Sequence, residues 1–102
     1  MPRFDVFPFK SGEITYLVDV QANLLSSLGS RVVLPLIPLS KSREEVVSRL
    51  KPIVKVQGKD HVLMTTDIGV VATKSLGEPI ANLSDSFEYE IINAIDFLFQ
   101  GF

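Results

Sequence analysis

The sequence predicts a mainly β fold that ends in a single C-terminal helix. Runs of β-branched and aromatic residues alternate with turn-forming residues through most of the chain, and only the final stretch shows three-and-four spacing. With 102 residues, 46% hydrophobic and 22% charged, the chain fits one domain, assigned to residues 1–102. About six strands and one helix indicate a small β barrel, or a folded sheet with a helix on it.

The first two strands are predicted over residues 3–9 and 14–20, joined by a turn at residues 10–13. Pro8 would place the end of the first strand at a sheet edge, because proline donates no hydrogen bond to a neighbour. Next comes a loop with three leucines, followed by a buried strand over 31–37. Two prolines are expected to interrupt or end that strand. The leucines are Leu24, Leu25 and Leu28, and the prolines are Pro35 and Pro38.

The middle of the chain predicts a second hairpin, with strands at 52–56 and 61–66 around the turn 57–60. Residues 70–73 continue the β pattern. Before the hairpin, Ser42 and Glu45 have the Ser-x-x-Glu spacing of a helix start, although a loop or short strand fits this segment nearly as well.

The C-terminal helix is predicted to open at residues 84–86, where Asp85 and Glu88 resemble a capping box. Its apolar stripe comprises Phe87, Ile91, Ala94, Ile95, Leu98 and Phe102, and further apolar residues off that stripe are Ile92, Phe97 and Phe99. A polar row recurs at intervals of four, three and four residues through Tyr89, Asn93, Asp96 and Gln100. Such an apolar terminus is costly to expose, so we expect burial in the chain's own core or against another protein. The excess of apolar positions favours a helix-mediated dimer.

Composition narrows the cellular setting and the possible partners. The absence of cysteine excludes disulfides and cysteine-based zinc sites, and neither a signal peptide nor a membrane-spanning run is apparent, so we expect a cytoplasmic protein. A net charge of −2 argues against a stand-alone nucleic-acid binder. Residues 41–74 hold seven bases and four acids, and residues 75–102 hold five acids and no base. This asymmetry indicates either two solvated faces or two ends that address different partners.

Residues arranged for catalysis are not apparent. His61 is the single histidine and has no second histidine or converging carboxylate beside it in sequence. No nucleophile-elbow or phosphate-loop motif occurs. Glu44 and Glu45 point in different directions on any regular element, and Thr65-Thr66-Asp67 is an ordinary strand-end turn. We therefore expect a binding protein with no catalytic residues, metal or cofactor.

Five strings of the sequence, taken in order, resemble the CcdB family, the toxins of type II toxin–antitoxin modules. They are Leu17-Val18-Asp19-Val20-Gln21 followed by Leu24-Leu25, Arg31-Val32-Val33-Leu34-Pro35-Leu36, Met64-Thr65-Thr66-Asp67, Glu78-Pro79-Ile80-Ala81-Asn82-Leu83-Ser84, and the terminal Asn93-Ala94-Ile95-Asp96-Phe97-Leu98-Phe99-Gln100-Gly101-Phe102. The resemblance implies an SH3-like β barrel with a long C-terminal helix, dimeric through that helix and neighbouring strands. It also implies a non-enzymatic toxin that binds the A subunit of DNA gyrase and traps the cleaved DNA. A partner antitoxin would neutralise the toxin through a disordered segment, and the complex would repress its own operator, with the antitoxin contacting the DNA.

The resemblance also assigns site residues. The gyrase-binding set is Gln21, Leu24, Leu25, Glu88, Asn93, Asp96, Gln100, Gly101 and Phe102. The antitoxin-binding set is Pro8, Phe9 and Lys10 in the first hairpin, with Lys41, Ser42, Arg43, Glu44 and Glu45.

Gln100 departs from the family pattern, because an aromatic residue stands there in the best-known member and two copies sandwich a gyrase arginine. Glutamine offers no π face, which forfeits about 0.5–2 kcal/mol per cation–π contact. Phe102 replaces a smaller aliphatic residue and is a candidate compensation. This departure leaves three outcomes for gyrase binding: weaker binding, binding to a different gyrase, or no binding.

Two rival functions remain. The first is a MazF-like endoribonuclease toxin on the same barrel, with Arg31 or Arg49, Thr65 and His61 at its site. The second is a non-toxic homologue that keeps only antitoxin binding, and Gln100 favours it.

Overall fold

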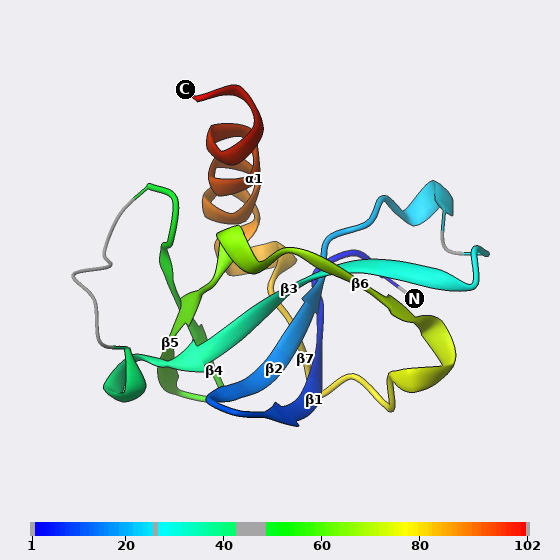
Figure 1. Cartoon of the computed structure of the whole chain (residues 1–102), viewed down its shortest axis with the longest axis horizontal. Helices are drawn as coiled ribbons and strands as arrows, with labels where there is room; N and C mark the ends of the chain where they lie inside the picture. The colour runs from blue at the N-terminus through cyan, green and yellow to red at the C-terminus, as the bar shows by residue number, and fades with distance from the viewer. Residues whose placement is uncertain (1, 26, 43–48, 102) are drawn as a thin grey trace.

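One antiparallel sheet, curled into a nearly closed barrel, carries most of the fold (Figure 1). The computed structural model describes residues 2–25, 27–42 and 49–101. Within them the sheet has seven strands, with β4-β5-β3-β2-β1-β7 side by side and β6 paired with β3. The strands are β1 Asp5–Ser11, β2 Ile14–Asp19, β3 Ser30–Pro38, β4 Ile53–Val56, β5 Lys59–Leu63, β6 Gly69–Ala72 and β7 Ala81–Asn82. Short 3-10 turns are η1 Asn23–Leu25, η2 Leu39–Lys41, η3 Thr65–Asp67 and η4 Thr73–Ser75, and the helix α1 spans Ser84–Gln100. The predicted barrel with a C-terminal helix is confirmed.

Strand β3 is the centre of the sheet, and it runs straight through Pro35, one of the two prolines predicted to interrupt or end it. On one side β3 pairs with β6 through residues 30–33 and then with β5 through residues 36–38. Pro35 lies between these two ladders, and its carbonyl accepts a hydrogen bond from the backbone N–H of Met64 at 2.9 Å. Pro35 also pairs with Leu17 of β2, but its carbonyl faces away from β2, and the nitrogen of an extended residue faces the same side as its carbonyl. The missing N–H therefore costs the β2–β3 ladder no hydrogen bond. Pro38 ends the strand, as predicted.

Both predicted hairpins are confirmed, and both turns are tighter than expected. Strand β1 continues to Ser11, which pairs with Ile14. In the second hairpin Val56 pairs with Lys59, so the turn consists of Gln57 and Gly58, at φ +51° and +80°. Two successive positive φ values match the right-handed twist of the flanking strands.

Other element boundaries differ modestly from the expectation. Strand β5 ends at Leu63 and the chain turns into η3, so residues 64–66 are not strand. The two-residue strand β7 was missed, and it covers only Asp5 and Val6 of β1. Pro8 therefore lies beyond β7, on an open stretch of the edge, as predicted. The helix start expected at Ser42–Glu45 falls mainly outside the described residues.

The helix packs on the barrel through its first three turns. Ile91 and Ala94 are fully buried in the main core, which also contains Val18, Leu34 and Val54 from the strands. Figure 1 shows the later turns of α1 rising away from the sheet. There Phe97 and Leu98 are half-buried and Phe99 is 68% exposed. No helix among the described residues is long and apolar enough to span a bilayer.

The predicted Asp85–Glu88 box does not cap the helix, whose N-cap position is Leu83 and carries no side-chain cap hydrogen bond. Asn82, one residue earlier, bonds to the first helical residue instead. The Asn82 side-chain oxygen accepts hydrogen bonds from the backbone N–H of Ser84 at 2.8 Å and from its hydroxyl. The Asn82 amide nitrogen donates to the Arg3 carbonyl and to the buried Asp5 carboxylate, at 3.0 and 2.9 Å. The expected box was wrong because the helix begins at Ser84, so Asp85 already lies inside the first turn.

Candidate functional site

The loop between β2 and β3 presents apolar side chains to solvent. Leu24 is 91% exposed, Leu25 is 44% exposed and Leu28 is 50% exposed. Exposure of several large apolar side chains on one short loop is typical of an interaction site. Leu24 and Leu25 belong to the predicted gyrase-binding set, and Leu28 was noted only as a loop residue.

Gln21 holds this loop in place from within. Its side-chain oxygen accepts a hydrogen bond from the backbone N–H of Val32 at 3.1 Å. Its amide nitrogen donates to the carbonyls of Leu25 and Ser30, each at 3.2 Å. Both N–H groups of the amide are thus used inside the chain. Gln21 therefore links the two ends of the loop to each other and to Leu25 near the apolar tip.

A buried ion pair lies under the loop. The Asp19 and Arg31 side chains are fully buried, and Arg31 donates to one Asp19 carboxylate oxygen from Nε, at 3.0 Å, and from Nη2. The second carboxylate oxygen accepts the backbone N–H of Gln21 at 3.0 Å. Arg31 also reaches the Leu25 carbonyl at 3.5 Å. The pair therefore contacts both Gln21 and the loop. Sequence reasoning missed this role, although a carboxylate within the apolar run Leu17–Val20 was a usable signal.

The predicted gyrase-binding residues of α1 line its outer side. Glu88, Asp96 and Gln100 are exposed, and Asn93 is half-buried. Gly101 ends the helix in the left-handed region, at φ +80°, with its N–H bonded to the Phe97 carbonyl at 2.9 Å. Phe102 lies outside the described residues.

The structure brings some of these residues together and separates others. Glu88 and the loop residue Asn23 line one depression of about 320 Å³ beside the N-terminal segment. Gln100 lies twelve residues further along α1 (Glu88 to Gln100), which is about 18 Å at 1.5 Å per residue. On one chain the two ends of the predicted gyrase-binding set are therefore far apart. One end lies at the base of the helix with the loop, and the other lies at the tip of the helix.

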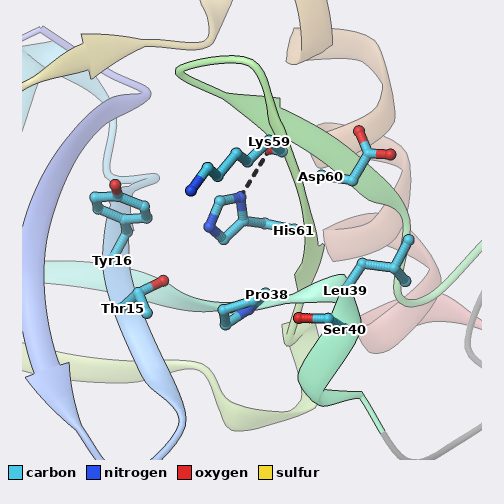
Figure 2. Close-up of a pocket in the computed structure, with 8 residues that line it drawn as sticks. All are labelled: Thr15, Tyr16, Pro38, Leu39, Ser40, Lys59, Asp60 and His61. Carbon is cyan, nitrogen blue, oxygen red and sulfur yellow. Dashed lines mark hydrogen bonds between the residues drawn. The ribbon is translucent and has the colours of Figure 1, made fainter.

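The predicted antitoxin-binding residues lie around a different end of the barrel. Pro8 and Lys10 on β1 and Lys41 in η2 are exposed, and Phe9 and Ser42 are half-buried. Arg43, Glu44 and Glu45 lie outside the described residues. Lys41 and Ser42 line one depression of about 320 Å³. A separate pocket of about 690 Å³, shown in Figure 2, is lined by Thr15, Tyr16, Pro38, Leu39, Ser40, Lys59, Asp60 and His61.

The residues suggested for an endoribonuclease site do not offer one. Arg31 is fully buried in its ion pair, and Thr65 is fully buried with its hydroxyl unbonded. The guanidinium of Arg49 packs over the Phe97 ring at 5.0 Å from its centroid. Arg31 and Thr65 are therefore not accessible for contact with an RNA phosphate. Among the described residues, no group of three or more His, Asp or Glu side chains is arranged to hold a metal ion.

Comparison with known protein families places the chain. The family model described as CcdB protein matches residues 3–101, nearly the whole sequence. Members of that family are gyrase-poisoning toxins of type II toxin–antitoxin modules and are not enzymes. The chain belongs to the CcdB family.

Proposed function

We propose that this CcdB-family member binds the A subunit of DNA gyrase and traps the gyrase–DNA complex while the DNA is cleaved. The observation that carries the proposal is the loop of Leu24 and Leu25, exposed at its tip and fixed by Gln21 at its base. A fixed apolar loop binds without a large cost of ordering. We assign the gyrase contacts to Leu24, Leu25, Glu88, Asn93, Asp96, Gln100, Gly101 and Phe102, with Gln21 as their positioning residue.

The test is a cleavage assay with purified protein, the gyrase of the cognate host, supercoiled plasmid and ATP. Linear DNA released after detergent and protease treatment is expected to rise with toxin concentration. Leu24→Asp is the matched variant, because a residue 91% exposed contributes little to folding and its substitution changes the contact alone. Absence of linear DNA with the wild-type protein contradicts the proposal.

A homodimer is part of the proposed mechanism. Support comes from the end of α1, where Phe97 and Leu98 stay half-buried and Phe99 is exposed although the barrel is otherwise well packed. A second copy that covers these turns would bury the apolar surface. Sedimentation equilibrium at micromolar concentration is expected to give twice the mass of one chain, and Leu98→Glu is expected to give a folded monomer. A monomeric wild-type protein would refute this part.

An antitoxin is the second proposed partner. We propose that it binds Pro8, Phe9, Lys10 and the segment from Lys41 to Glu45, and that the complex represses its own operator through the antitoxin's DNA-binding domain. The net charge of −2 supports this division of labour, since the toxin itself lacks a basic excess. Both targets are cytoplasmic, so we propose a cytoplasmic location. An operator gel shift with antitoxin alone and with both proteins measures the contribution of the toxin.

A non-toxic homologue that only binds antitoxin is the alternative that Gln100 favours. The side chain is exposed on the last helical turn and carries no aromatic face for a guanidinium. Harmless overexpression together with tight antitoxin binding would select this alternative over the gyrase poison.

A further inference from the structure

A turn at residues 2–5 connects the loop of Leu24 with the base of α1. The Asp5 N–H donates to the Pro2 carbonyl at 3.3 Å across this turn. The turn shares one depression, of about 320 Å³, with the loop residue Asn23 and the helix residue Glu88. Leu24 follows Asn23 in the chain, and both Leu24 and Glu88 belong to the assigned gyrase contacts. The N-terminal turn therefore lies next to two parts of the proposed contact surface.

The backbone of Arg3 bonds to both of these parts. Its N–H donates to the Asn23 side-chain oxygen, and its carbonyl accepts from the Asn82 amide nitrogen at 3.0 Å. The Asn82 side-chain oxygen in turn accepts the N–H of Ser84, the first residue of α1, at 2.8 Å. Three hydrogen bonds thus form one continuous chain from the loop to the first turn of the helix.

The Arg3 side chain makes a second attachment to the loop. Its Nε donates at 2.9 Å to the carbonyl of Val20, where the chain leaves β2 and enters the loop. The guanidinium also lies over the Phe4 ring, 4.8 Å from its centroid. The turn is therefore bonded to the start of the loop through Val20 and to its apolar part through Asn23.

Phe4 has a backbone conformation that a phenylalanine rarely adopts, at φ +72°. A residue other than glycine keeps such a conformation only where neighbouring contacts impose it. The Phe4 N–H donates to the Asp19 carbonyl at 2.7 Å, and its carbonyl accepts from the Leu83 N–H at 3.0 Å. Its ring is 3% exposed and belongs to the main core. These contacts hold the strained turn, and strained residues of this kind cluster at functional sites.

We infer that Arg3 and Asn23 are positioning residues of the gyrase-binding surface, which hold the loop at a fixed place relative to α1. The inference rests on the proposed gyrase binding and adds how two of its contact regions are kept in one arrangement. Gln21 supports the loop internally, whereas Arg3 and Asn23 attach it to the helix base. A target that contacts Leu24 and Glu88 together binds more tightly when neither region has to be ordered on binding.

The experiment measures the affinity of variants for the purified A subunit of the cognate gyrase by calorimetry. Asn23→Ala removes the acceptor for the Arg3 N–H and is expected to weaken binding about two- to tenfold. Asn23→Asp keeps an acceptor oxygen and is expected to bind within about twofold of the wild type. Ser27→Ala, at an exposed residue of the same loop outside the depression, is expected to bind like the wild type. Asn23 is exposed, so its variants keep the fold.

A double variant separates positioning from direct contact. Asn82→Ala breaks the same chain of hydrogen bonds on the other side of Arg3. If both links maintain one arrangement, the protein with Asn23→Ala and Asn82→Ala is expected to bind about as weakly as the weaker single variant. Hydrogen exchange at the Arg3 amide should accelerate in Asn23→Ala and keep the wild-type rate in Asn23→Asp.

Three results would overturn the inference and leave the proposed gyrase binding intact. They are wild-type affinity in Asn23→Ala, equal losses in Asn23→Ala and Asn23→Asp, and losses that multiply in the double variant. The second result would mean that the Asn23 amide contacts gyrase itself, and the third would mean that the two asparagines act independently. Failure of the wild-type protein to bind the A subunit would overturn the proposed function, and this inference with it.

Discussion

Replacement of Gln21 by methionine tests whether the loop needs its internal support. Methionine has nearly the same length and volume but forms none of the three hydrogen bonds to Val32, Leu25 and Ser30. At about 0.5–1.5 kcal/mol for each neutral hydrogen bond, and with water replacing part of the loss at a half-buried position, the change is about 1–3 kcal/mol. Most of it should appear as local opening of the loop.

Two measurements separate a positioning role from direct contact. Hydrogen exchange at the Val32 amide should accelerate about five- to hundredfold in Gln21→Met, and gyrase affinity should fall about tenfold through loss of preorganisation. Leu24→Ala is the control. At 91% exposure it should leave exchange and stability unchanged and should weaken gyrase binding directly.

Either of two results would refute this reasoning. Unchanged exchange at Val32 with lost affinity would mean that the Gln21 amide contacts gyrase itself. Faster exchange with unchanged affinity would mean that gyrase tolerates a mobile loop. The first outcome returns Gln21 to the set of direct contacts, and the second removes it from the gyrase site.

Four further substitutions follow from the structure. Arg31→Met should destabilise the fold by about 3–5 kcal/mol in urea denaturation, because Asp19 is then buried without its partner; a loss under about 1 kcal/mol would contradict the burial of the pair. Asn82→Ala should cost about 1–2 kcal/mol in the same assay through loss of its hydrogen bonds to Ser84 at the start of α1 and to the Asp5 carboxylate, and an unchanged midpoint would count against these contacts. Gly58→Ala should cost about 1 kcal/mol at φ +80°, whereas Gly77→Ala, without positive φ, should be neutral; equal effects would argue against the two-residue turn. Gln100→Trp should strengthen gyrase binding about two- to thirtyfold by restoring a π face, and unchanged affinity would separate this helix end from the gyrase arginine.

Strands and the helix were predictable because they depend on local spacing. Alternation and β-branched runs marked the strands, and three-and-four spacing marked α1, whose Ile91 and Ala94 are buried as the stripe required. The continuity of β3 was not predictable from Pro35 alone. Its missing N–H matters only if a neighbouring strand needs it, and the switch from β6 to β5 at that point is a property of the sheet.

The candidate site was predictable in its residues but not in the roles of all of them. The exposure of Leu24 and Leu25 fits a contact surface, whereas Gln21 turns its amide into the loop. Likewise Asp85 had the right spacing for a cap, but the helix begins at Ser84, and Asn82, placed by β7, bonds to that residue from just before the helix. Side-chain partners that come from distant strands leave no periodic signal in the sequence.

The distance between the loop and the helix tip limits how one chain can bind a target. The loop and Glu88 lie at the base of α1, and Gln100 and Gly101 lie about 18 Å further along it, on turns that rise away from the barrel (Figure 1). Since those turns carry the exposed Phe99, a second copy packed along them would set two helix tips side by side between two loops. The target would then be held by the paired tips, and the loops would fix its orientation on either side. In this arrangement a substitution at Gln100 places two changed side chains side by side against the target, whereas a substitution in the loop changes two contacts that lie apart.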